Sequence, residues 1–375
     1  MKILILGDVG ASQNNHQAFC HADNDLFSTE IQNICAGADA VLLNLEKPLT
    51  DISSPLGKCP PDYSASTDSI NGIKLLHPTA VTLANNHIMD QREQGLQSTI
   101  NVLKQNRIQF AGAGDNLQAA RQPVIINNPE GITVGIYACC EKEFSFATDT
   151  APGANVFDPL VTFDDIEELK NRCDYLIVLF HGGMQGYPYP TPYQQKVCRK
   201  MCEKGANMVV CQHSHIVGCE EHYSNGTIVY GQGNLLLDDV DTDSWHTGIM
   251  LSINIDKHHE DMEIIPTEVR NHKVIIHHNE QMIKQEYYDR SMEILDGQFV
   301  ESSFRNHCRN KLPDYLLKFS GTGSIRRRII NRLKANKLIL IKYNTKELYY
   351  ILDYLYCSTH REAIESSIED RIGGQ

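Results

Sequence analysis

Two histidines separated by one serine, His213 and His215, come directly after the apolar run 207–211. Imidazole is the commonest metal ligand among side chains, but an isolated histidine pair is more often part of a surface or a core. The pair therefore predicts a metal site only if other ligand-type residues follow other apolar runs.

Polar donors stand at the carboxyl ends of five apolar runs. Each one alone has an ordinary structural explanation, since Asp8 suits a turn, Asn85 and Asn86 suit a left-handed loop, and His181 suits a glycine-rich loop. In α/β sheets, however, ligands bind outside the carboxyl ends of the strands. The whole set therefore predicts one shared site, made of Asp8 after 2–7, Asn44 and Glu46 at the end of 40–45, Asn85, Asn86 and His87 after 80–84, His181 after 175–180, and His213 and His215 after 207–211.

The residue types indicate the class of metal. Carboxylate, amide oxygen and imidazole without thiolate suit Mn²⁺, Fe or Zn²⁺, and this set is too rich in nitrogen for Ca²⁺. These donors exceed what one four-coordinate ion needs, but they fit two divalent metal ions that share a carboxylate. Two such ions are a standard device for activating water.

The secondary-structure elements that position these residues can be predicted from the same sequence. Continuous apolar runs at 2–7, 40–45, 80–84, 132–138, 175–180 and 207–211 predict strands that are covered on both faces. The segments 92–106, 164–172 and 192–204 have helical composition, and Gly205 is a plausible end for the last. This alternation predicts an α/β sandwich. Strand-like text at 227–277 predicts further strands in the same domain.

The text after about residue 280 is helical in character and rich in charged and aromatic residues. We therefore expect two units, a catalytic-type domain at 1–278 and a helical C-terminal extension at 279–375. A candidate hinge at 320–324 precedes the basic stretch 325–337. That stretch reads as an amphipathic helix that packs on the body, or as a contact for an anionic polymer, a lipid surface or a partner. Homodimerisation or partner docking through this extension is left open.

Composition excludes some functions. A net charge of −13 over 375 residues argues against nucleic-acid binding. No window approaches the roughly 18 apolar residues of a transmembrane segment, and the short run at the amino terminus reads as a strand rather than a signal peptide. The twelve cysteines are irregularly spaced and include no CxxC pair. Together these features predict a soluble, reduced, cytoplasmic protein.

Six motifs in order resemble the CapA-type capsule and poly-γ-glutamate synthesis proteins, whose fold is that of the calcineurin-like metallophosphoesterases. The resemblance covers roughly residues 1–270 and implies a four-layer α-β-β-α sandwich. The motifs are "GDV" (7–9), "NLEKPLT" (44–50), "ANNHIMD" (84–90), "HGG" (181–183), "GANMVVCQHSH" (205–215) and "IVYGQGNLLLD" (228–238).

The same resemblance implies a role for each residue. Asp8 and His215 would bind the first metal, and Glu46 would bridge both metals where the wider superfamily has aspartate. Asn86, His181 and His213 would complete the second site, and His87 would be the general acid. Residues that hold these side chains in place would be Asn44, Asn85, Asp90 and Asn234.

The chain departs from the family pattern at two places. Gly10 stands where the superfamily has the histidine of Asp-x-His. The family often has His-Trp-Gly followed by a glutamate, whereas this chain has Gly182 in place of the tryptophan and Gln185 in place of the glutamate. The only tryptophan, Trp245, is far away in the sequence, so we expect a pocket contact to be missing.

Three functions remain compatible with these residues. The first is a metal-activated water attacking a phosphoester, and the second is amide hydrolysis or transfer on a γ-glutamyl polymer. The third is a non-catalytic capsule-assembly protein with a decayed site.

Overall fold

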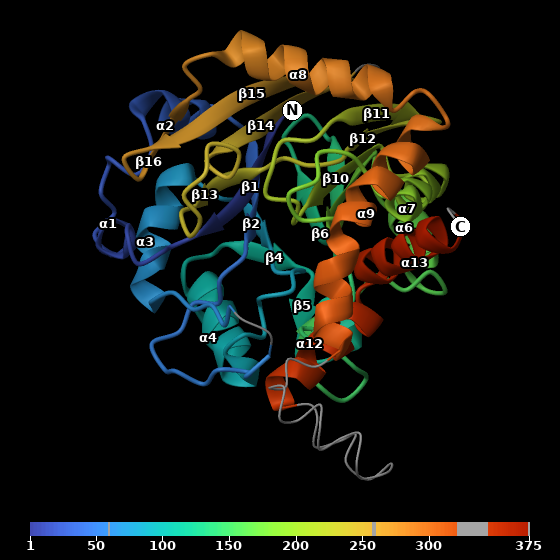
Figure 1. Ribbon diagram of the computed structural model, residues 1–375. Coiled ribbons are helices and arrows are strands. Elements are labelled where there is room, and N and C mark those ends of the chain that lie inside the picture. The colour runs from blue at the N-terminus through green and yellow to red at the C-terminus, as the bar shows by residue number, and fades with distance from the viewer. Residues whose placement is uncertain (59–60, 257–259, 321–343, 374–375) are drawn as a thin grey trace.

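The continuous apolar runs form the strands of two sheets that lie face to face, as the computed structural model shows (Figure 1). The structure describes residues 1–58, 61–256, 260–320 and 344–373. The first sheet has the order β16 (Lys273–Ile276), β15 (Glu260–Arg270), β14 (Thr247–Ile255), β1 (Lys2–Gly10), β2 (Ala40–Leu45), β3 (Ala80–Thr82), β4 (Gln109–Ala111), with β13 (Asn234–Leu237) also paired to β1.

The second sheet is parallel at its centre and takes up three of the six predicted strands. Its order is β11 (Glu220–Tyr223), β12 (Gly226–Val229), β10 (Met208–Gln212), β9 (Tyr175–His181), β7 (Thr133–Cys140), β6 (Val124–Asn127). Two short strands, β5 (Ala113–Gly114) and β8 (Gly153–Ala154), pair with each other beside it.

Alternate residues of the second sheet pack into different cores. Ile177 and Leu179 of β9 belong to the core shared with the first sheet, whereas Leu176 and Val178 face the outer helices. This is the period of two expected for a strand buried on both faces. The outer helices over this sheet are α6 (Thr162–Lys170) and α7 (Pro192–Glu203).

Helices of the N-terminal half cover the outer face of the first sheet (Figure 1). They are α1 (His16–Cys20), α2 (Thr29–Ala36), α3 (Ile70–Ile73) and α4 (Arg92–Gln105), with the 3₁₀ turns η1 (Thr67–Ser69) and η2 (Lys74–Leu76), while the short α5 (Leu117–Ala120) contacts β5 and β8. The order of layers is therefore helix, sheet, sheet, helix, and the predicted α-β-β-α sandwich is confirmed.

The chain after β16 is helical wherever the structure describes it. Helix α8 (Glu280–Glu293) packs on β15 and β11, and the division at residue 278 stays a prediction. The remaining helices are α9 (Phe299–Ser320), α12 (Thr345–Tyr356) and α13 (Ser358–Gly373). The candidate hinge beyond Ser320 and the basic stretch 325–337 lie outside the described residues. Among those described, no helix has the length and apolarity to cross a bilayer.

Candidate metal centre

The carboxyl ends of strands from both sheets meet at one buried place. Asp8 lies in β1 and Glu46 follows β2, while His181 ends β9 and His213 and His215 follow β10. Contacts described below join these residues with Asn86 and His87, which follow β3. The structure therefore brings together all seven predicted ligands and proton-transfer groups.

The first group consists of Asp8, Glu46 and His215. His215 Nδ1 lies 3.4 Å from Asp8 Oδ2, and His215 Nε2 lies 3.6 Å from Glu46 Oε1. Neither Asp8 Oδ2 nor either Glu46 carboxylate oxygen accepts a hydrogen bond from any residue that the structure describes, although all three atoms are buried. Buried carboxylate oxygens normally have partners, so these atoms are arranged for a ligand that is not a side chain.

The electrostatics of this group fit a divalent cation. Burial raises the pKa of Glu46 well above its usual value. Burial opposes ionisation of Asp8 too, but the neighbouring His215 outweighs it and holds the Asp8 pKa at about 2. For His215, burial is likewise outweighed by the two carboxylates, which raise its pKa to about 9. A proton on His215 thus does part of the neutralising work that a metal ion would do.

The second group consists of Asn86, His181 and His213. His181 Nε2 lies 3.1 Å from Asn86 Oδ1 and 3.1 Å from His213 Nδ1. Burial, assisted by the charge of neighbouring histidines, lowers the pKa of His181 and brings that of His213 to about 4. Both imidazoles are therefore neutral, which is the form that binds metals.

Amide side chains fix the orientation of these ligands. Asn44 Nδ2 donates to Asp8 Oδ1 at 2.8 Å and lies 3.3 Å from His181 Nδ1, so it contacts both groups. Asn85 Nδ2 donates to Asn44 Oδ1 at 3.0 Å. Asn234 Oδ1 lies 2.9 Å from His215 Nδ1. Supporting contacts of this kind are what a metal ligand needs to keep its geometry.

The backbone of the His-x-His pair is strained. His213 has φ of 86° and His215 has φ of 58°, in the left-handed region that non-glycine residues rarely adopt. Strain of this sort persists where the surroundings over-determine it, typically at functional sites. Here it turns both imidazoles back toward the strand ends.

His87 is placed beside these groups by Asp90. Its Nδ1 lies 2.7 Å from Asp90 Oδ2, while Lys58 Nζ lies 2.7 Å from Asp90 Oδ1. Burial and the nearby Lys58 charge lower the pKa of His87 well below its usual value, and burial raises that of Asp90 to about 6. In the tautomer that carries its proton on Nδ1, facing Asp90, Nε2 is the atom of His87 that can exchange a proton with a substrate.

The two departures from the family pattern have physical explanations. A Cβ at Gly10 would lie 2.7 Å from Cγ of Lys47, so the Lys47 side chain occupies the space of the missing histidine. A Cβ at Gly182 would lie 2.7 Å from Cγ of Glu141. At each position the side chain of a neighbouring residue fills the space that a larger residue in place of the glycine would need.

A cavity of about 160 Å³ opens at the centre, and several of its lining residues were missed from the sequence. The expectation that a tryptophan contact is absent is wrong, because the ring of Trp245 packs against that of His215 with their centroids 4.2 Å apart. Sequence distance hid this contact, which a loop at 238–246 creates. The other lining residues not predicted are Lys58, Pro61, Tyr63, Glu143, Phe144, Asp353 and His360.

A second group of metal-type residues, Glu268, His277 and His278, lies elsewhere, on the wall of the largest of the described cavities, about 820 Å³. Glu268 already pairs with Arg270 at 3.1 Å and with His278 at 3.0 Å. Because its carboxylate is satisfied, this group lacks the unpartnered oxygens that mark the first site.

The comparisons with known proteins agree with the motifs. The family model described as Bacterial capsule synthesis protein PGA_cap matches residues 2–239, which is more than half of the chain. The PGA biosynthesis protein CapA of Bacillus subtilis is 27% identical over 213 residues, covering 56% of each chain. A probable polyglutamine synthesis accessory protein of Mycobacterium tuberculosis is 30% identical over 212 residues, covering 53% of this chain and 56% of that one.

Among solved structures, that of a hypothetical protein from Thermus thermophilus aligns with a TM-score of 0.46 and 12% identity, covering 72% of this chain and 99% of that one. The chain spans about half the length of the curated relatives it matches. The match to the family model is independent of these lengths, and on that basis the chain belongs to the bacterial capsule synthesis protein family PGA_cap.

Proposed function

We propose that this chain is a metal-dependent hydrolase of the phosphoesterase type that acts in the cytoplasm in capsule or poly-γ-glutamate metabolism. The observation that supports it most is the set of three buried, unpartnered carboxylate oxygens of Asp8 and Glu46 facing His215. Asp8, Glu46 and His215 would hold one divalent ion, and Asn86, His181 and His213 the other, with Glu46 shared. Mn²⁺, Fe and Zn²⁺ all suit these ligands.

When bound, the ions supply an activated water and neutralise negative charge that develops on the substrate. The chain's own residues supply the rest. His87, neutral with its proton on Nδ1 beside Asp90, would take up at Nε2 the proton that the attacking water releases and pass it to the leaving group. Asn44 and Asn234 keep the carboxylate and imidazole ligands in position, and Trp245 and Tyr63 border the cavity and limit its access to water.

Amide hydrolysis on a γ-glutamyl polymer is the second candidate. Two relatives favour it, since one is described as a PGA biosynthesis protein and another as a probable polyglutamine synthesis accessory protein. The same residues would perform it, because an acyl transfer also needs activated water and a proton donor. A non-catalytic assembly role is the third, and the filling of the Gly10 position by Lys47 favours it.

One assay separates these functions. The purified full chain is loaded with Mn²⁺ and offered nitrophenyl phosphate, bis-nitrophenyl phosphate and a γ-glutamyl peptide, with Glu46→Ala as the control for metal-dependent turnover. We expect hydrolysis of a phosphoester by the wild type only. Turnover of the peptide alone would replace the phosphoesterase proposal with the amidase, and less than about one equivalent of metal without any turnover would favour the assembly role.

A further inference from the structure

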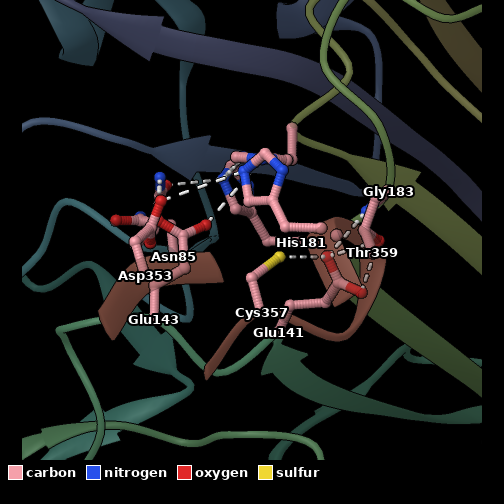
Figure 2. A network of polar contacts seen from close by, with 12 residues as sticks. Asn85, Glu141, Glu143, His181, Gly183, Asp353, Cys357 and Thr359 are labelled. Atoms are coloured by element: carbon pink, nitrogen blue, oxygen red, sulfur yellow. Dashed lines mark hydrogen bonds and ion pairs between the residues drawn. The ribbon is translucent and has the colours of Figure 1, made fainter. Parts of the chain in front are cut away.

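Glu141 is a buried carboxylate that the proposed chemistry does not use. Its side chain accepts hydrogen bonds from Ser358 Oγ at 2.7 Å, from Thr359 Oγ1 at 2.7 Å and from the Gly183 N–H at 3.2 Å, as Figure 2 shows in part. Its own N–H donates to the His181 carbonyl at 2.9 Å. Glu141 thus ties the start of helix α13 to the strand end that carries a predicted metal ligand.

The glycine at position 182, where this chain departs from the family pattern, leaves room for the Glu141 side chain to make these contacts. A Cβ at Gly182 would lie 2.7 Å from Cγ of Glu141, so a tryptophan at that position would displace the Glu141 side chain. The glycine at position 182 and the anchoring of the C-terminal helices are two aspects of one local arrangement.

Two further contacts hold helices α12 and α13 on the same loops. Phe146 packs edge-on against Tyr356, with ring centroids 5.8 Å apart. Glu362 accepts a hydrogen bond from the Tyr193 N–H at 2.7 Å and one from Thr191 Oγ1. The helices are therefore fixed to the segments that follow β7 and β9.

Anchored in this way, the helices bring two side chains to the cavity of the metal centre. Asp353 and His360 both line it, with Asp353 Oδ2 3.9 Å from His360 Nε2. Asp353 Oδ1 is buried and accepts no hydrogen bond from the residues that the structure describes. His360 is itself held by the Tyr315 hydroxyl, 2.9 Å from its Nδ1.

Glu143 lines the same cavity and connects it to the metal ligands. Its Oε2 accepts a hydrogen bond from Asn86 Nδ2 at 3.0 Å, and its Oε1 lies 3.9 Å from His213 Nε2. Figure 2 shows Glu143 and Asp353 together, beside Asn85 and His181. The wall next to the metal ligands therefore carries two neighbouring acidic groups, and burial together with Glu143 raises the pKa of Asp353 to about 8, so that a bound cation would stabilise its charged form.

We propose that α12 and α13 form the specificity-determining wall of this pocket, and that Asp353 binds an ammonium group of the substrate while the reacting group lies at the metal centre. The inference rests on the proposed function for the location of the reacting group. A carboxylate without a donor selects a cationic donor, because a charge-assisted hydrogen bond relieves its burial. A cavity of about 160 Å³ suits a small group, such as a small amine-bearing molecule or an amino-terminal chain end.

Calorimetry on the full, Mn²⁺-loaded chain tests this without relying on turnover. The two probes are 2-aminoethylphosphonate and ethylphosphonate, which differ in the ammonium group. We expect the wild type to bind the first about tenfold more tightly or better, as a charge-assisted hydrogen bond implies. In Asp353→Asn the two affinities should become equal within about twofold, whereas Glu365→Gln, on an exposed position of α13, should keep the preference.

Equal affinities in the wild type, binding of neither probe, or a preference that persists in Asp353→Asn would each overturn the proposal. The wild-type comparison remains decisive even if a variant fails to fold. Nitrophenyl phosphate hydrolysis by the same sample reports separately on the proposed function. Hydrolysis together with equal affinity for the two probes would contradict the role of Asp353 but not the proposed phosphoesterase activity.

Discussion

At the scale of single residues, buried carboxylate charge decides what the site can do. Neither carboxylate oxygen of Glu46, nor Oδ2 of the neighbouring Asp8, accepts a hydrogen bond from the described residues, and both carboxylates face His215. Leaving such groups buried costs several kcal/mol unless a cation compensates them. In the metal-free protein a proton on His215 provides part of that compensation. Function and stability are therefore in opposition at these positions until metal binds.

Replacing Glu46 by glutamine separates the two effects. The variant should bind less than half of the wild-type metal, because it loses the shared ligand. In excess chelator it should be more stable than the wild type by roughly 1–2 kcal/mol, because a buried charge has gone. Metal analysis and urea unfolding measure these two quantities. Glu93→Gln, on the exposed face of α4, is the matched control, and full metal content in Glu46→Gln would refute the shared-ligand role.

His87→Ala should give the opposite pattern. Its imidazole contacts Asp90 and Lys58 rather than the carboxylates of the first metal group. Metal content should therefore stay near that of the wild type, while kcat falls about 10²–10⁴-fold, as for a lost proton-transfer group. Steady-state kinetics on the Mn²⁺-loaded protein, with the nitrophenyl phosphoester that the wild type is expected to hydrolyse, would show this. An unchanged kcat would remove His87 from the mechanism.

At the scale of elements, the loops after the strands carry the chemistry and the strands only position them. The six predicted strands form because each run of Val, Ile and Leu has two layers to pack against, and such continuous apolar runs can be recognised in the amino-acid sequence. Strand β15 was not singled out, because its charged residues alternate with apolar ones and Pro266 interrupts it. Its pairing with β14 depends on an antiparallel partner that the local sequence does not reveal.

The candidate site, like the strands, could be predicted only in part from the sequence. Donors directly after apolar runs, such as Asp8 and His181, were found because strand ends in a parallel sheet converge. Glu141 also comes directly after a strand, β7. The sequence does not indicate this, because the apolar run predicts a strand that ends at Ala138, whereas β7 continues to Cys140. Asp353 and His360 reach the cavity only through helix packing, which no spacing in the sequence encodes.

Docking of helix α13 should depend on pH through Glu362. Burial raises the pKa of this carboxyl from 4.5 to about 7. The folded protein thus holds the proton more tightly than the unfolded chain, and stability from this group is present below pH 4.5 and is lost as pH rises through 7. The loss amounts to about 2–3 kcal/mol.

Urea unfolding of wild type and Glu362→Gln between pH 4.5 and 8 measures it. The amide cannot ionise, so we expect the variant to lack this part of the decline, and its stability relative to the wild type should rise with pH. Glu365→Gln, exposed on the same helix, should follow the wild type. Parallel pH curves for wild type and Glu362→Gln would show that Glu362 ionises normally.

At the scale of the whole molecule, the ligands come from both sheets. Asp8 lies in a strand of the first sheet and Glu46 directly after another, while His181 ends a strand of the second sheet and His213 and His215 follow one. The shared core joins the sheets by apolar packing, and Asn44 adds polar contacts to Asp8 and His181. Bound ions would add links between the sheets at the end where the buried charges weaken them.

Metal should therefore stabilise the entire sandwich and not one loop. At free Mn²⁺ about 100 times the Kd, binding to the native state adds about 2.7 kcal/mol, which raises Tm on the order of 5 °C relative to protein in chelator. Scanning calorimetry measures the shift, and amide hydrogen exchange should slow at the carboxyl ends of strands in both sheets. Glu46→Gln should show little of either effect. If metal bound stoichiometrically but protected amides of one sheet only, the ligands would not act across the two sheets, and the link between metal binding and global stability would fail.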